Sequence, residues 1–195
     1  TDAGRVYFAG SKFDANNKLI DRIFTSNSDG LSCFSMSITT NDFLDIELSP
    51  DQLAVSKDGK TLVFTEYEAD SDSKALWTVS SAGGTASLLT TNVDDVANED
   101  YLSVSYDGSH ALFRMGDAGN SRLAVIPTNG GSIIELESIV GFSLTSLGGG
   151  INADGSMVAA IGLNLGGAIP GIELVLIDLV AKTSSVIQTP DILPF

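Results

Sequence analysis

The chain has 195 residues, of which 43% are hydrophobic, and a formal net charge of −15. This length and hydrophobic content are typical of one globular domain with a substantial core, and they exclude a disordered chain. The negative charge makes nucleic acid an unfavourable partner, because phosphates would be repelled. A single cysteine excludes an intrachain disulfide, and no apolar run is long enough for a helix that spans a bilayer.

The chain opens with a loose turn signal, Asp2-Ala3-Gly4, followed by two β-prone segments at 5–10 and 21–26. A third segment, 31–39, contains the only cysteine, Cys33. Because Cys33 lies among apolar residues, we expect it to be buried as a small hydrophobic side chain.

The clearest unit of the sequence follows. Four segments rich in β-branched and aromatic residues lie at 53–56, 61–68, 75–81 and 86–91. The turn signal Asp58-Gly59 separates the first two. The pattern predicts four antiparallel strands joined by short connections. Trp77 lies in the middle of the third segment, and we expect it to pack in the core.

The Asp-Gly turn recurs at Asp107-Gly108 and Asp154-Gly155, so the units repeat about every fifty residues. Repeats of this length built from four strands are the signature of a β-propeller. The sequence therefore predicts one all-β domain over 1–195, with no helix of convincing period. Its four-stranded antiparallel blades have approximate repeats at 2–50, 51–98, 99–146 and 147–195. We interpret the Asp-Gly turns as structural, because Asp accepts turn amides and Gly supplies positive φ.

A propeller blade has an inner strand, which lies at the central axis, followed by three more strands. The sequence shows four sets of the three further strands but only three inner strands. This count favours part of a larger ring, and it leaves open irregular closure by the tail 191–195, a small four-bladed ring, or two chains combined into one ring.

The second unit, LAVSKDGKTLVF…ALWTVSSAGGTASLLT, resembles the TolB-like β-propeller repeat. The resemblance covers nearly the whole chain, and it is strong in the second unit, good in the third and partial in the others. It identifies a type of repeat. Proteins with that repeat include periplasmic TolB, which binds envelope proteins, and the propellers of prolyl-oligopeptidase-type hydrolases.

Catalytic machinery is not visible in the sequence. His110 is the sole histidine, and the chain has no G-x-S-x-G nucleophile elbow. His110 begins a strand directly after a tight turn, so we expect it to point to solvent. One histidine and one cysteine also make a zinc site implausible. We therefore expect a protein without enzymatic activity or a bound cofactor.

Acidic residues concentrate in the segments that a propeller places on one face, between the second and third strands and between blades. Asp70 and Asp72 alternate as at the start of a calcium loop, so Ca²⁺ is the one metal we consider. A second group is a candidate surface for a cationic protein partner. It comprises Asp94, Asp95, Glu99 and Asp100. The alternative for both groups is a solvated face that aids solubility.

The fourth unit differs in having two uncharged, glycine-rich stretches, 143–150 and 164–172, which we interpret as loops. Leu165, Ile169 and Pro170 would form an apolar edge that contacts another blade, a subunit or a partner.

The sequence thus predicts a non-catalytic binding or assembly module with an acidic loop face and an apolar edge. The composition suits a periplasmic, extracellular or cell-surface location. Two alternatives stay open: the propeller portion of a larger prolyl-oligopeptidase-like hydrolase, and a structural subunit that polymerises through unpaired strands.

Overall fold

The computed structural model describes residues 5–13, 15–16, 19–27, 33–40, 50–67, 74–93, 101–116, 121–164 and 171–187. In chain order the elements are β1 (Arg5–Phe13), β2 (Leu19–Asn27), β3 (Cys33–Ser35), β4 (Ile38–Thr40), β5 (Pro50–Val55), β6 (Thr61–Tyr67), β7 (Lys74–Ser80), β8 (Gly84–Val93), β9 (Leu102–Val104), β10 (His110–Met115), β11 (Arg122–Pro127), β12 (Ile134–Glu135), α1 (Glu137–Val140), β13 (Leu144–Ile151), β14 (Met157–Asn164), β15 (Gly171–Asp178) and β16 (Thr183–Ile187). No helix in this part of the chain is long and apolar enough to cross a membrane.

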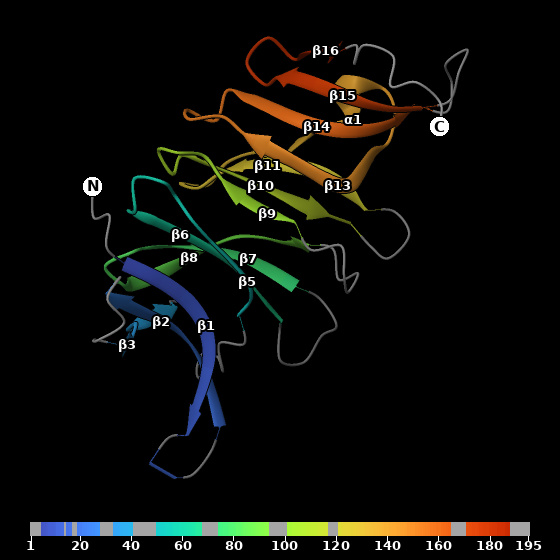
Figure 1. The fold of residues 1–195 in the computed structure, drawn as a ribbon. Helices are drawn as coiled ribbons and strands as arrows, with labels where there is room; N and C mark the ends of the chain where they lie inside the picture. Colours follow the sequence, from blue (N-terminus) through green and yellow to red (C-terminus); the bar gives the residue numbers. More distant parts are fainter. Residues whose placement is uncertain are drawn as a thin grey trace.

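The strands form four sheets that follow one another in chain order, from blue to red in Figure 1. Blade 1 is β1–β3, blade 2 is β5–β8, blade 3 is β9–β12 and blade 4 is β13–β16. Consecutive strands within each blade are antiparallel neighbours. Blades 2, 3 and 4 each begin with an inner strand, whereas blade 1 has none among the described residues. The predicted count of three inner strands is therefore confirmed for this part of the chain.

An apolar core fills the space between each pair of neighbouring blades, because side chains alternate between the two faces of a strand. In β6, Leu62 and Phe64 contact blade 1, whereas Val63 contacts blade 3. A third core lies between blades 3 and 4. Trp77 is 4% exposed in the core between blades 1 and 2, which confirms its predicted packing role.

Residues 31–39 do not form the continuous strand that the sequence predicted. β3 pairs antiparallel with β2, and the chain then crosses to blade 2, where β4 pairs in parallel with β8. All three residues of β3 are exposed, including Cys33. The prediction that Cys33 is buried is wrong, because β3 is the short edge strand of its sheet and its side chains lie outside the described cores.

Two further elements differ from the sequence prediction. The third unit ends in α1, a helix of four residues, which is too short to give a periodic apolar pattern. The stretch 143–150, predicted as a loop, mostly belongs to the inner strand β13 of blade 4. One of its glycines has a packing reason: a Cβ on Gly149 would lie 3.0 Å from the carbonyl oxygen of Ala159 on the neighbouring strand.

Candidate functional site

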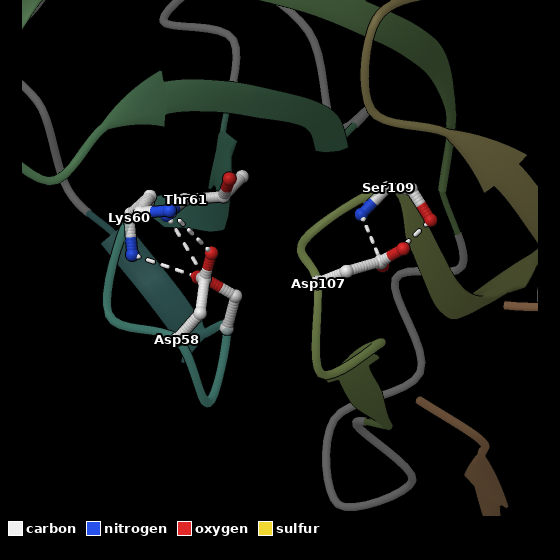
Figure 2. A network of polar contacts seen from close by, with 6 residues as sticks. Asp58, Lys60, Thr61, Asp107 and Ser109 are labelled. Carbon is white, nitrogen blue, oxygen red and sulfur yellow. Dashed lines mark hydrogen bonds and ion pairs between the residues drawn. The ribbon is translucent and has the colours of Figure 1, made fainter. Parts of the chain in front are cut away.

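The Asp-Gly turn of blade 2 is held by the carboxylate of Asp58. One oxygen, Oδ1, accepts a hydrogen bond from Ser56 Oγ at 2.7 Å and another from the Lys60 amide at 3.0 Å (Figure 2). The amide of Thr61 donates in turn to Ser56 Oγ at 2.9 Å. The side chains thus satisfy the amides that a tight turn leaves without backbone partners.

The turns of blades 3 and 4 repeat this arrangement. Asp107 Oδ1 accepts from Ser105 Oγ at 2.8 Å. It also accepts from the Ser109 amide at 2.9 Å, as Figure 2 shows. Asp154 Oδ1 accepts from the amide and the hydroxyl of Ser156, at 3.1 and 2.7 Å. The three turns are therefore one structural device used three times.

These hydrogen bonds lower the pKa of each turn carboxyl group, because they stabilise its charged form. The largest cause is the hydroxyl of Ser56 for Asp58, that of Ser109 for Asp107 and that of Ser156 for Asp154. The carboxylates are occupied in organising their own turns. The structural interpretation of these turns is confirmed.

Backbone hydrogen bonds link successive turns from blade to blade. The amide of Asp58 donates to the carbonyl of Tyr106 in the next turn at 3.1 Å, and the amide of Asp107 donates to the carbonyl of Ala153 at 3.0 Å. The same atom of the turn is the donor each time. We call this edge of the array, where the three Asp-Gly turns lie, the turn end.

His110 contributes to the turn end, and the prediction that it points to solvent is wrong. Its ring is half-buried against Gly155 of the next blade, where an added Cβ would lie 2.5 Å from the His110 Cγ. Its Nδ1 lies 2.8 Å from Ser109 Oγ, which also donates to Asp107. The serine stands between the acid and the histidine, whereas a catalytic triad needs the histidine in the middle. This geometry fits a packed turn.

The opposite edge of the sheets is the loop end, where β6 ends and β7 begins, and where β14 and β15 meet in the same way. β8 also ends there. Because consecutive strands are antiparallel, the segments 68–73, 94–100 and 165–170 all attach at this edge.

An unusual carboxyl group lies at the loop end of β6. Glu66 is 2% exposed, and neither of its carboxylate oxygens has a hydrogen-bond partner among the described residues. It lies on the same face of β6 as Phe64, in the direction of blade 1. Burial raises the pKa of Glu66 to about 7, because an unpaired charge is costly away from water.

Two other charged side chains are buried among the described residues, and they too lie at the loop end. Lys74 begins β7 at 1% exposure, and Arg114 in β10 is 8% exposed. The Arg114 Nε donates to Ser121 Oγ at 2.6 Å. Nearby, Arg122 forms a 2.6 Å ion pair with Glu135 that is well exposed to water. Ionisable groups thus underlie the edge to which the predicted binding segments attach.

The residues that the sequence singled out for binding lie outside the described residues. They are Asp70, Asp72, Asp94, Asp95, Glu99, Asp100, Leu165, Ile169 and Pro170. Calcium binding at the first two and partner contact at the others stay predictions. Within the described residues, no group of three or more His, Cys, Asp or Glu side chains could hold a metal ion. The sequence pattern counts Glu66 among the acidic residues of the loop face, and this assignment is wrong, because the carboxyl group of Glu66 is buried.

Comparison with solved structures identifies the architecture. The chain matches the β-propeller domain of the trilobed protease from Pyrococcus furiosus with a TM-score of 0.61 at 10% identity, over 97% of this chain and 55% of the other. The fold is that of a β-propeller. The propeller fold expected from the TolB-like repeat is confirmed.

Two further propeller matches come from enzymes of different chemistry. Oligogalacturonate lyase in complex with manganese has a TM-score of 0.60 and 13% identity, over 94% of this chain and 53% of its own. Acylaminoacyl peptidase has a TM-score of 0.58 and 14% identity, over 97% of this chain and 31% of its own. The chain thus spans about half of the first two matched chains and less of the third. No family model and no curated protein matches the sequence.

Proposed function

We propose that this chain is a non-catalytic β-propeller module that binds a protein partner through its loop end, in the periplasm or at the cell surface. The observation that carries the proposal is the difference between the two ends of the blades. At the turn end, carboxylates and backbone amides bond to one another within and between blades. At the loop end, the described strands instead carry buried ionisable groups.

A rigid array with one internally bonded end is a suitable support for binding loops. Its blades are fixed by cores between neighbours and by hydrogen bonds between turns, so connecting segments can vary without disturbing the fold. The same architecture supports a protease, a lyase and a peptidase in the matched structures, which agrees with function residing in attached loops or domains.

The charge of the connecting segments indicates the kind of partner. Segments 68–73 and 94–100 contain acidic residues and neither lysine nor arginine. Because a field of one sign steers and orients a partner of the opposite sign, the proposed partner presents a cationic surface.

A pair of charge-neutralising variants tests this proposal with cytochrome c as a cationic protein probe. The variant Asp94→Asn/Asp95→Asn removes two charges from the proposed surface. The control Asp2→Asn/Asp29→Asn removes two charges from segments that the repeat pattern assigns to the turn end. We expect binding measured by calorimetry at low salt to weaken several-fold in the first variant and little in the control. Equal weakening in both would mean that only net charge matters, and the proposed surface would be rejected.

A second candidate is the propeller portion of a larger hydrolase, which recruits or filters substrate for a catalytic domain. The matches to the trilobed protease propeller and to acylaminoacyl peptidase favour it. Sequencing the complete reading frame tests it. An adjoining α/β domain with a G-x-S-x-G elbow is expected from this candidate, and a reading frame without one would reject it.

A further inference from the structure

The three apolar cores between neighbouring blades follow one rule. One face of a blade, which we call its forward face, packs on the opposite or rear face of the next blade. Val63 and Leu76 on the forward face of blade 2 meet Phe113 and Ala124 on the rear face of blade 3. The core between blades 3 and 4 is built in the same way, with Leu112 on the forward face of blade 3. Among the described blades, the forward face of blade 4 and the rear face of blade 1 therefore remain uncovered by another blade.

The forward face of blade 4 is apolar, although no described blade covers it. Val158 and Val175 are fully buried against blade 3, so their neighbours in β14 and β15 point to the other face. Among those neighbours, Met157 is 37% exposed and Ile172 is 64% exposed. In the adjoining β16, Ile187 pairs with Leu174 on this same face and is 39% exposed. Central strands with two apolar faces are expected where both faces are covered.

The rear face of blade 1 is apolar as well. Ile23 is fully buried against blade 2, so Phe24 beside it points to the rear. Phe24 is paired in register with Phe8, and their rings stack with centroids 5.6 Å apart. Val6 on the same face is 52% exposed, and Phe8 is 40% exposed. Exposed apolar patches of this kind mark interaction surfaces.

Backbone hydrogen bonds at the turn end also distinguish blade 4 from blades 2 and 3. The amides of Asp58 and Asp107 each donate to a carbonyl in the turn of the next blade, whereas no described residue offers a carbonyl to the amide of Asp154. The side-chain packing agrees. The glycine of each following turn abuts the first residue of the second strand in the blade before it, Thr61 or His110, and in blade 4 the corresponding residue is the exposed Met157. Blade 4 thus carries the amide donor, Asp154, and the side chain, Met157, that would make this contact with a following blade. No described residue supplies the carbonyl and the glycine that would receive them.

We propose that the forward face of blade 4 binds the rear face of blade 1 in a second copy of this chain. Within the chain, the forward face of one blade packs on the rear face of the next. The two uncovered surfaces are one face of each kind, so they can pack on each other in the same way. Two such contacts close a ring with two-fold symmetry. The chain covers 55% of the matched protease propeller and 53% of the matched lyase, so two copies supply about one complete propeller. Because each copy carries a net charge of −15, added salt should strengthen the association.

Light scattering coupled to size-exclusion chromatography tests the proposal on the 195-residue chain. We expect a species of twice the 20.3 kDa chain mass. Ile172→Asp places a charge on the forward face and Val6→Asp places one on the rear face. Each should weaken dimerisation at least tenfold. Val180→Asp is the matched control, because Val180 is 81% exposed in the turn that follows β15. Circular dichroism verifies that all variants keep their β structure.

Mixing the two variants gives the decisive result. A forward face damaged by Ile172→Asp and a rear face damaged by Val6→Asp leave one intact contact between the two different chains, so the mixture should form a heterodimer that neither variant forms alone. A monomeric wild-type chain, a Val6→Asp variant that dimerises normally, a mixture that stays monomeric, or wild-type fibres in place of a discrete dimer would each overturn the proposal.

Discussion

The turn end of the blades repeats the same contacts from one blade to the next, whereas the loop end does not. At the turn end, the same Asp carboxylate accepts hydrogen bonds in three successive blades, at nearly the same distances. At the loop end, equivalent positions carry unrelated side chains. Glu66 in blade 2 and Met115 in blade 3 lie at the same separation from the Asp of their turns, and both are buried on the rear face of their blade.

The difference indicates which end maintains the fold. A position that must make the same contact in every blade keeps its residue type from one blade to the next. A position that serves one blade alone is free to change, even to an ionisable residue whose burial is unfavourable. We expect substitutions at the turn end to be costly and one substitution at the loop end to be stabilising.

The largest effect is expected for Gly108→Ala. Gly108 has a φ of +73°, and an added Cβ would lie 2.8 Å from the Cβ of Thr61 in blade 2. Positive φ and the steric overlap together should lower the free energy of unfolding by about 2–4 kcal/mol. Urea denaturation followed by circular dichroism measures the change.

Gly59→Ala is the matched control, because Gly59 holds the same place in the turn of blade 2 with a φ of +75° and no atom within 4 Å of an added Cβ. Only the conformational cost should remain, about 1–2 kcal/mol. Equal losses in the two variants would show that the contact between turns contributes nothing.

These turns also explain why the sequence predicts so much of the fold. An Asp-Gly pair before an apolar β-prone segment is a local signal, and it recurs because each blade needs the same turn. The repeat count, the three inner strands and the burial of Trp77 follow from such local patterns. They are confirmed in the described residues.

The features that sequence reasoning missed depend on what lies across a strand from each residue. Cys33 stands in an apolar stretch, yet it is exposed on β3, the edge strand of its sheet. The glycine-rich β13 reads as a loop, although close approach to Ala159 is what requires Gly149. Glu66 looks like a solvated charge at a strand end, yet it is buried on the face of β6 that packs on blade 1. Tertiary neighbours decide all three.

Glu66→Met provides the second test of the comparison, since Met is the residue that blade 3 has at this position. The pKa of Glu66 is raised to about 7 from an ordinary value of 4.5, so folding favours the protonated carboxyl. The stability of the wild type relative to the variant should therefore be lost as pH rises from about 4.5 to about 7, and stay low above that. At pH 8 the variant should be more stable by about 1–3 kcal/mol.

Glu66→Gln separates charge from shape. It removes the charge but leaves a buried amide without partners, so its stability at pH 8 should lie between those of the wild type and the Met variant. Thermal melts at pH 4 and pH 8 measure all three proteins. The interpretation fails if the advantage of Met over the wild type is as large at pH 4 as at pH 8, because a packing effect alone does not depend on pH.

The smallest effect is expected for the ion pair of Arg122 and Glu135, which tests whether burial or mere position at the loop end makes a charge costly. Their N–O distance is 2.6 Å, but the side chains are 41% and 38% exposed, so water and salt screen the attraction. A double-mutant cycle with Arg122→Met and Glu135→Gln should give a coupling free energy below about 1 kcal/mol that shrinks in 0.5 M salt. Exposure would then account for the contrast with Glu66, because both charges of the pair stay hydrated while the Glu66 carboxylate does not. A coupling of several kcal/mol, unchanged by salt, would instead mean that the surroundings of the loop end strengthen electrostatic interactions whatever the exposure, and the stabilising effect assigned to Glu66→Met would need another cause.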